Sequence, residues 1–117
     1  MEPHPTPPTL ALVRDLMFMS KIRAESTAAG VALTVVREPA KLGLTPGRAL
    51  LVDLTLPGAL EAAAAWKQSQ QKPVIGFVGH TETETIEAAR VAGIDQVLTR
   101  GQFTGLLPQI FKQFTGE

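Results

Sequence analysis

A single carboxylate stands at the end of an apolar run in the middle of the chain. Residues 49–58 read ALLVDLTLPG, so Asp53 follows the apolar run and precedes a Pro-Gly turn. Such a run is typical of a strand that is buried on both faces. A carboxylate in this place can act as a nucleophile or help to hold a cation in a crevice. It can also be only a polar residue that ends a strand, and the rest of the chain decides between these interpretations.

Composition excludes several kinds of site and partner. The chain has 117 residues, with 11 Lys and Arg against 11 Asp and Glu, so its balanced charge gives no footprint for nucleic acid or an anionic membrane. It has no cysteine and two histidines, which excludes disulfides, thiolate chemistry and a metal site built from histidines. No apolar run approaches the roughly 20 residues of a membrane helix, and the N-terminus does not resemble a signal peptide. We therefore expect a soluble, cytoplasmic domain.

Strands and helices alternate along the chain and must position any reactive group. Apolar, β-branched runs indicate strands, and apolar residues three or four apart indicate helices. The strands are expected over residues 10–13, 31–36, 49–53, 73–78 and 94–98. The helices are expected over residues 16–29, 39–42, 59–70, 81–93 and 107–114, with a loop over residues 99–103.

The ends of these elements carry their own signals. Residues 1–9 contain four of the nine prolines and are expected to form a flexible lead-in, which leaves residues 10–117 as a single domain. Asp15 occupies the position of an N-cap for the first long helix, and Gly30 that of its C-cap. Pro108 is compatible with the last helix only near the first turn of that helix.

This alternation predicts an α/β fold. With short loops and right-handed crossovers it gives a flavodoxin-like, doubly wound sheet of five parallel strands, order 2-1-3-4-5, with helices on both faces. Ligands of such sheets bind beyond the carboxyl ends of the strands, at the switch point between the first and third strands. Five residues are expected at this rim: Arg14, Asp15, Asp53, Val78 and Arg100.

Over residues 9–114 the chain resembles the receiver domain of two-component response regulators (CheY-like proteins). The segments that carry the resemblance are VDLTLPG (52–58), PVIGFVG (73–79) and AGIDQVLTRG (92–101). In that family the aspartate that ends the third strand accepts a phosphoryl group with the help of Mg²⁺. The resemblance thus implies that Asp53 is the phosphoacceptor, and that Asp15, Asp53 and the carbonyl of Thr55 are the metal ligands. It implies no other cofactor.

The chain departs from the family pattern at five positions around the site. Arg14 replaces the first acid of the family's strand-1 pair, and Val78 replaces the hydroxyl residue that ends the fourth strand. Arg100 stands for the lysine of the fifth strand, Gly101 for the proline after it, and Val97 for the switch aromatic. The usual relay, in which a hydroxyl moves inward and an aromatic ring follows, therefore lacks both partners.

A fixed cation where acidity is expected disfavours Mg²⁺. We expect Arg14 or Arg100 to take the place of the metal, pairing with Asp15 or Asp53, and to hold the domain in one state.

Three functions remain open. The first is an atypical, non-enzymatic receiver-like domain that signals through protein–protein contact with a histidine kinase or a downstream effector, as a monomer or homodimer, with phosphorylation absent or non-standard. The second is a functional Asp53 phosphoacceptor in a phosphorelay. The third is a flavodoxin-like domain that binds a small ligand. The resemblance implies a partner face made of Glu84, Glu87, Arg90, Val91, Gln102 and Phe103.

Three further residues have structural interpretations. We expect His80 to be an exposed loop residue and Trp66 to be a half-buried anchor of its helix. Gly76, in the middle of a predicted strand, indicates close packing of a neighbour against the backbone rather than a ligand site.

Overall fold

The computed structural model describes residues 7–79 and 83–113. Most of the proline-rich lead-in and His80 lie outside these ranges, as does the start of the helix that was expected from residue 81.

A single parallel sheet forms the centre of the molecule. Its strands run in the order β2-β1-β3-β4-β5, as the alternation of elements predicts. Their bounds are β1 (Thr9–Leu12), β2 (Leu33–Val36), β3 (Ala49–Asp53), β4 (Val74–Val78) and β5 (Gln96–Thr99). The connecting helices are α1 (Leu16–Ala29), the short 3₁₀ helix η1 (Pro39–Lys41), α2 (Ala59–Gln70), α3 (Thr83–Val91) and α4 (Arg100–Gln113).

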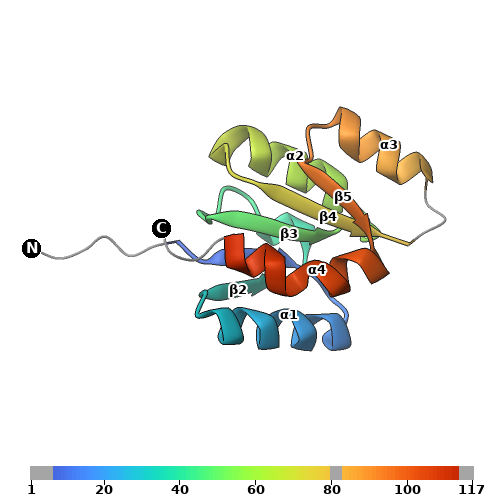
Figure 1. Cartoon of the computed structure of the whole chain (residues 1–117). Coiled ribbons are helices and arrows are strands. Elements are labelled where there is room, and N and C mark those ends of the chain that lie inside the picture. Colours follow the sequence, from blue (N-terminus) through green and yellow to red (C-terminus); the bar gives the residue numbers. More distant parts are fainter. Residues whose placement is uncertain (1–6, 80–82, 114–117) are drawn as a thin grey trace, which may run out of the picture.

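Two helical layers bury the sheet. Helices α1 and α4 cover one face, and α2 and α3 cover the other (Figure 1). Every residue of β1, β3 and β4 is buried, which explains why these strands are apolar without alternation. The predicted fold class, strand order and two-sided helical cover are confirmed.

Capping residues set the ends of α1. Asp15 Oδ1 accepts hydrogen bonds from the backbone N–H groups of Met17 (2.8 Å) and Phe18 (3.1 Å), as an N-cap does. Gly30 adopts a left-handed conformation (φ 73°) and its N–H donates to the carbonyls of Ser26 and Thr27. Both predicted caps are confirmed.

The start of α4 differs from the prediction. A loop was expected over residues 99–103, but the helix begins at Arg100. The side chain of Gln102 accepts a hydrogen bond from Thr99 N (3.0 Å), and Thr99 Oγ1 accepts one from Gln102 N (3.1 Å). This reciprocal pair is a capping box, and the helix therefore begins at the residue that directly follows β5. Pro108 consequently lies inside the helix rather than in its first turn, and its placement there was predicted wrongly.

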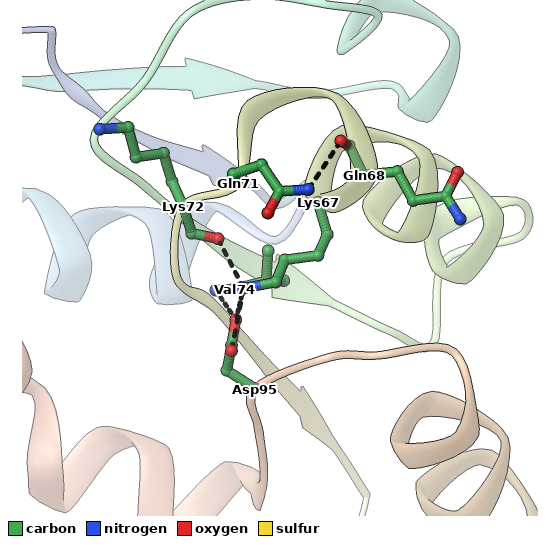
Figure 2. A network of polar contacts seen from close by, with 6 residues as sticks. All are labelled: Lys67, Gln68, Gln71, Lys72, Val74 and Asp95. Atoms are coloured by element: carbon green, nitrogen blue, oxygen red, sulfur yellow. Dashed lines mark hydrogen bonds and ion pairs between the residues drawn. The ribbon is translucent and has the colours of Figure 1, made fainter.

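Two polar networks hold α2 in place. Trp66 is fully buried rather than half-buried, and its Nε1–H donates to the carbonyl of Thr45 (2.7 Å). At the next residue of the helix, Lys67 Nζ lies 2.8 Å from Asp95 Oδ2, and the same oxygen accepts a hydrogen bond from Val74 N (2.8 Å; Figure 2). This cluster joins α2 to the beginnings of β4 and β5, at the edge of the sheet opposite to the carboxyl ends.

Within the described ranges, no helix combines the length and the apolar character that are needed to cross a membrane.

Candidate functional site

Asp53 is the last residue of β3 and lies almost wholly inside the protein. Its side chain is 4% exposed. In the sheet it is paired with Phe77 of β4, which is fully buried, and the residue before it, Val52, is also fully buried. A carboxylate in such surroundings loses its hydration and needs partners inside the protein.

Both oxygens of this carboxylate have partners. Oδ1 accepts a hydrogen bond from the hydroxyl of Thr55 (2.6 Å) and a second from the backbone N–H of Thr55 (3.0 Å). Oδ2 lies 3.6 Å from Nη2 of Arg100. The chain itself therefore supplies two neutral donors and one cation for the buried charge.

Arg100 is held from two sides. It is the first residue of α4, where the helix dipole disfavours a cation, so the nearby carboxylate of Asp53 offsets an unfavourable position. Its guanidinium carbon lies 5.5 Å from the centroid of the Phe18 ring, which is the geometry of a cation–π contact. With its side chain 45% exposed, Arg100 forms the boundary between the buried carboxylate and solvent.

An aromatic stack lies beneath Arg100. Phe18 stacks on Phe77 with ring centroids 4.8 Å apart, and Phe77 stacks on Phe103 at 4.3 Å. The three rings come from α1, β4 and α4, so they join the elements that surround Asp53. The stack fixes the position of Phe18, and Phe18 in turn limits the positions that are open to Arg100.

Arg14 does not take part in this site. Its side chain is exposed and its Nε–H donates to the carbonyl of Arg37, 3.2 Å away, beyond the end of β2. Among the described residues it makes no ion pair with Asp15 or Asp53. Of the two cations expected to pair with these acids, only Arg100 does so.

The donor set around Asp53 suits Mg²⁺ poorly. Mg²⁺ takes oxygen ligands in a strict octahedron, usually carboxylates with water. Here Asp53 already accepts hydrogen bonds from Thr55 and forms an ion pair with Arg100, and Asp15 Oδ1 caps α1. No cluster of three or more His, Cys, Asp or Glu that could hold a metal occurs in the parts of the chain that the structure describes.

Comparison with known proteins supports the fold through structure alone. No family model matches the sequence, and neither does any curated protein. A response regulator from Hahella chejuensis superposes with a TM-score of 0.79 at 17% identity, covering 94% of this chain and 96% of the other. A CheY-like receiver domain from Methanospirillum hungatei JF-1 gives 0.79 at 15% identity, with 94% of each chain covered. This chain has the receiver fold.

A third structure of this fold contains a metal ion. The receiver domain of a sensor histidine kinase from Pseudomonas aeruginosa PAO1, with magnesium coordinated in its active-site cleft, superposes with a TM-score of 0.74 at 18% identity. It covers 97% of this chain and 100% of the other.

Val78 is the last residue of β4, the fourth strand of the fold, and it is fully buried. It is paired with Thr99 of β5 and brings no hydrogen-bond donor to the rim.

The predicted partner face is mostly exposed. Glu84, Glu87, Arg90, Val91 and Gln102 are all on the surface, and Val91 is 80% exposed. Phe103 is the exception, because it is fully buried in the aromatic stack. Its assignment to the partner face is wrong, since α4 begins earlier than expected and turns this ring into the core.

The sequence contained signals for the contacts that were missed. Asp53 and Thr55 have the Asp-x-Thr spacing of a side-chain turn, in which a carboxylate accepts bonds from the residue two positions on. Thr99 and Gln102 have the spacing of a capping box, which places Arg100 in the first helical turn.

Proposed function

We propose that this chain is an atypical receiver-type signalling module that acts through protein–protein contact, without enzymatic turnover, and that phosphorylation of Asp53 is absent or non-standard. The observation that carries the proposal is the engagement of both Asp53 oxygens by Thr55 and Arg100.

The charges around Asp53 disfavour phosphorylation. In a phosphoryl transfer to a carboxylate, cations must neutralise the oxygens of the transferred group. Here the cation Arg100 already neutralises the acceptor, with a gross attraction of about 5 kcal/mol at 3.6 Å before desolvation and screening. A phosphoryl donor has to displace this contact before it reaches the oxygen. The apolar Val78 supplies no hydrogen bond to the product.

The proposed partner is a protein of the same signalling type, a histidine kinase or a downstream effector. Support comes from the receiver fold and from the exposed surface of α3, where Val91 lies next to the weak Arg90–Glu87 pair (3.9 Å). An exposed valine beside charges of both signs fits a protein surface better than nucleic acid or membrane. The module works as a monomer or homodimer in the cytoplasm.

A functional phosphoacceptor is the second candidate. Asp53 ends β3 at the switch point of the sheet, and Arg100 could turn from the carboxylate to a phosphoryl group. One structure with the same fold is a phosphorylated cyanobacterial phytochrome response regulator, 16% identical to this chain with a TM-score of 0.75.

Intact-mass spectrometry separates the two candidates. The protein is incubated with a small phosphodonor and Mg²⁺, beside Asp53→Asn as the control. We expect no phosphoryl adduct on the wild-type chain. An adduct that is lost in Asp53→Asn would overturn the first proposal and establish the second.

A second experiment tests the partner face. The wild-type protein and Val91→Glu serve as baits, with Lys72→Glu as an exposed charge-changing control on another part of the surface. We expect the wild type to recover a histidine kinase or a downstream effector. The control should recover the same protein, and Val91→Glu should not. Equal recovery by all three baits would show that Val91 on α3 is not part of the interface.

A further inference from the structure

A cavity with a positively charged rim lies beside β2, apart from Asp53. It has a volume of about 780 Å³ and is lined by Arg14, Val35, Val36, Arg37, Glu38 and Lys41. Small-molecule sites in proteins commonly have volumes of about 300–1,000 Å³. This cavity therefore has the size of a ligand site.

The topology brings the cations together. Strands β1 and β2 are parallel neighbours with Leu12 paired to Val36, so the residues that follow the two strands meet at one edge. Arg14 follows β1, and Arg37 follows β2. The hydrogen bond from Arg14 Nε to the carbonyl of Arg37 (3.2 Å) fixes the first guanidinium at the rim.

Within the part of the chain that the structure describes, ion pairs do not balance the charge of the rim. Among the described residues, none of Arg14, Arg37 and Lys41 forms an ion pair with a carboxylate. Even Glu38, which lines the same cavity, is not paired with them. Three cations and one carboxylate leave a net charge of +2 around one hollow, although the whole chain has a net charge of +0. Their mutual repulsion is relieved when an anion binds between them.

From this arrangement we propose that the cavity binds a small molecule that carries a diphosphate-type group. Two guanidinium groups can each take one phosphate in a forked pair of hydrogen bonds, and Lys41 adds a point charge. Val35 and Val36 contribute apolar surface for an organic portion of the ligand. This site is independent of the proposed role of Asp53.

Binding is measured by NMR titration of the full chain with inorganic pyrophosphate, without divalent metal and at constant ionic strength. We expect saturable shifts of the backbone amides of Val35, Val36, Arg37 and Glu38. The double variant Arg37→Ala, Lys41→Ala should weaken binding by about a hundredfold, since each charge-assisted contact accounts for about a tenfold change. Glu38→Gln should strengthen binding, because it removes the one negative charge of the rim.

The matched control is Lys72→Ala, Arg23→Ala, which removes one lysine and one arginine elsewhere. Arg23 lies on α1, and Lys72 precedes β4, so neither lines the cavity. We expect the control to bind pyrophosphate as the wild type does. The proposed site would be contradicted if both double variants weakened pyrophosphate binding equally. It would also be contradicted if the chemical-shift changes were not centred on residues 35–38. Citrate that binds as tightly as pyrophosphate would overturn the assignment to a diphosphate.

Discussion

Arg100 Nη2 lies 3.6 Å from Asp53 Oδ2, and the two residues are the first of α4 and the last of β3. The pair thus joins the carboxyl edge of the sheet to the helix that covers it. Because β5 runs directly into α4 through the Thr99–Gln102 capping box, the position of Arg100 follows from the start of the helix. Local helix capping therefore brings the backbone of Arg100 to the edge of the sheet where Asp53 lies.

Removing the cation should destabilise the fold. In Arg100→Ala the buried carboxylate of Asp53 retains only the two Thr55 donors, so we expect the free energy of unfolding to fall by about 1–2 kcal/mol. This is less than the loss at a fully buried pair, because Arg100 is 45% exposed and water partly replaces it. Urea unfolding, followed by the fluorescence of Trp66, the single tryptophan, measures the change.

A double-mutant cycle isolates the pair. Asp53→Asn removes the charge that Arg100 faces. In that background, Arg100→Ala should therefore destabilise the protein less than it does in the wild type, and we expect the two effects to differ by at least about 0.5 kcal/mol. The exposed Arg23→Ala serves as the control cation and should show no coupling with Asp53→Asn. Strict additivity of the Arg100 and Asp53 changes would show that the contact does not contribute to stability.

The hydroxyl of Thr55 should contribute at least as much to stability as the cation does. Thr55→Val keeps the shape of the side chain but removes the 2.6 Å hydrogen bond to Asp53 Oδ1. We expect a loss of about 1.5–3 kcal/mol in the free energy of unfolding, as for other hydrogen bonds to charged groups. Thr55→Ser retains the donor and should lose much less. If valine and serine had the same effect, the hydroxyl would not be the group that holds the carboxylate.

The sequence was sufficient to predict the fold, because apolar strands that alternate with helices admit few topologies. It placed Asp53 at the edge of the sheet for the same reason. It did not decide which cation would meet Asp53, since Arg14 and Arg100 both follow strands at that edge and the direction of a side chain depends on tertiary contacts. The carbonyl of Arg37 holds Arg14 on one side, and the ring of Phe18 holds Arg100 on the other. Neither contact is local in sequence.

Asp95 gives stability a dependence on acid pH. Burial raises the pKa of Asp95, but the hydrogen bond and charge of Lys67 and the N–H of Val74 lower it more, so the pKa lies below its ordinary value (Figure 2). A carboxyl whose pKa is depressed in the folded state contributes stability above its unfolded pKa of about 3.9 and loses that contribution as the pH falls through its folded value.

The measurement is the free energy of unfolding of the wild type and of Asp95→Asn at each pH from 2 to 7. The wild type should be more stable by a constant amount above about pH 5, and the difference should shrink below about pH 4. Glu87→Gln, which removes a more exposed carboxylate in a 3.9 Å pair with Arg90, should track the wild type throughout. A difference between wild type and Asp95→Asn that persists unchanged at pH 2 would assign the effect of Asp95 to shape rather than to charge.

The space around Gly76 of β4 is too small for even a methyl side chain. A Cβ built there would lie 2.5 Å from Cδ1 and 2.9 Å from Cγ of Leu54, a residue that is 5% exposed and has little room to move. We expect Gly76→Ala to lower the free energy of unfolding by about 1–3 kcal/mol through overpacking. Gly105→Ala is the matched control. It adds a methyl group within α4 where nothing lies within 4 Å apart from the adjacent residues and the helix's own backbone, and it should stabilise the protein by about 0.5–1 kcal/mol.

Leu54→Ala tests the cause of the Gly76 effect. Alone it should destabilise by about 2–5 kcal/mol, because it empties a buried site. Combined with Gly76→Ala it removes the clashing atoms, so the added methyl group partly fills the space that leucine leaves. The double variant should consequently be more stable than the sum of the single changes implies. A sum that matches the double variant would show that Gly76 is required for some reason other than its contact with Leu54.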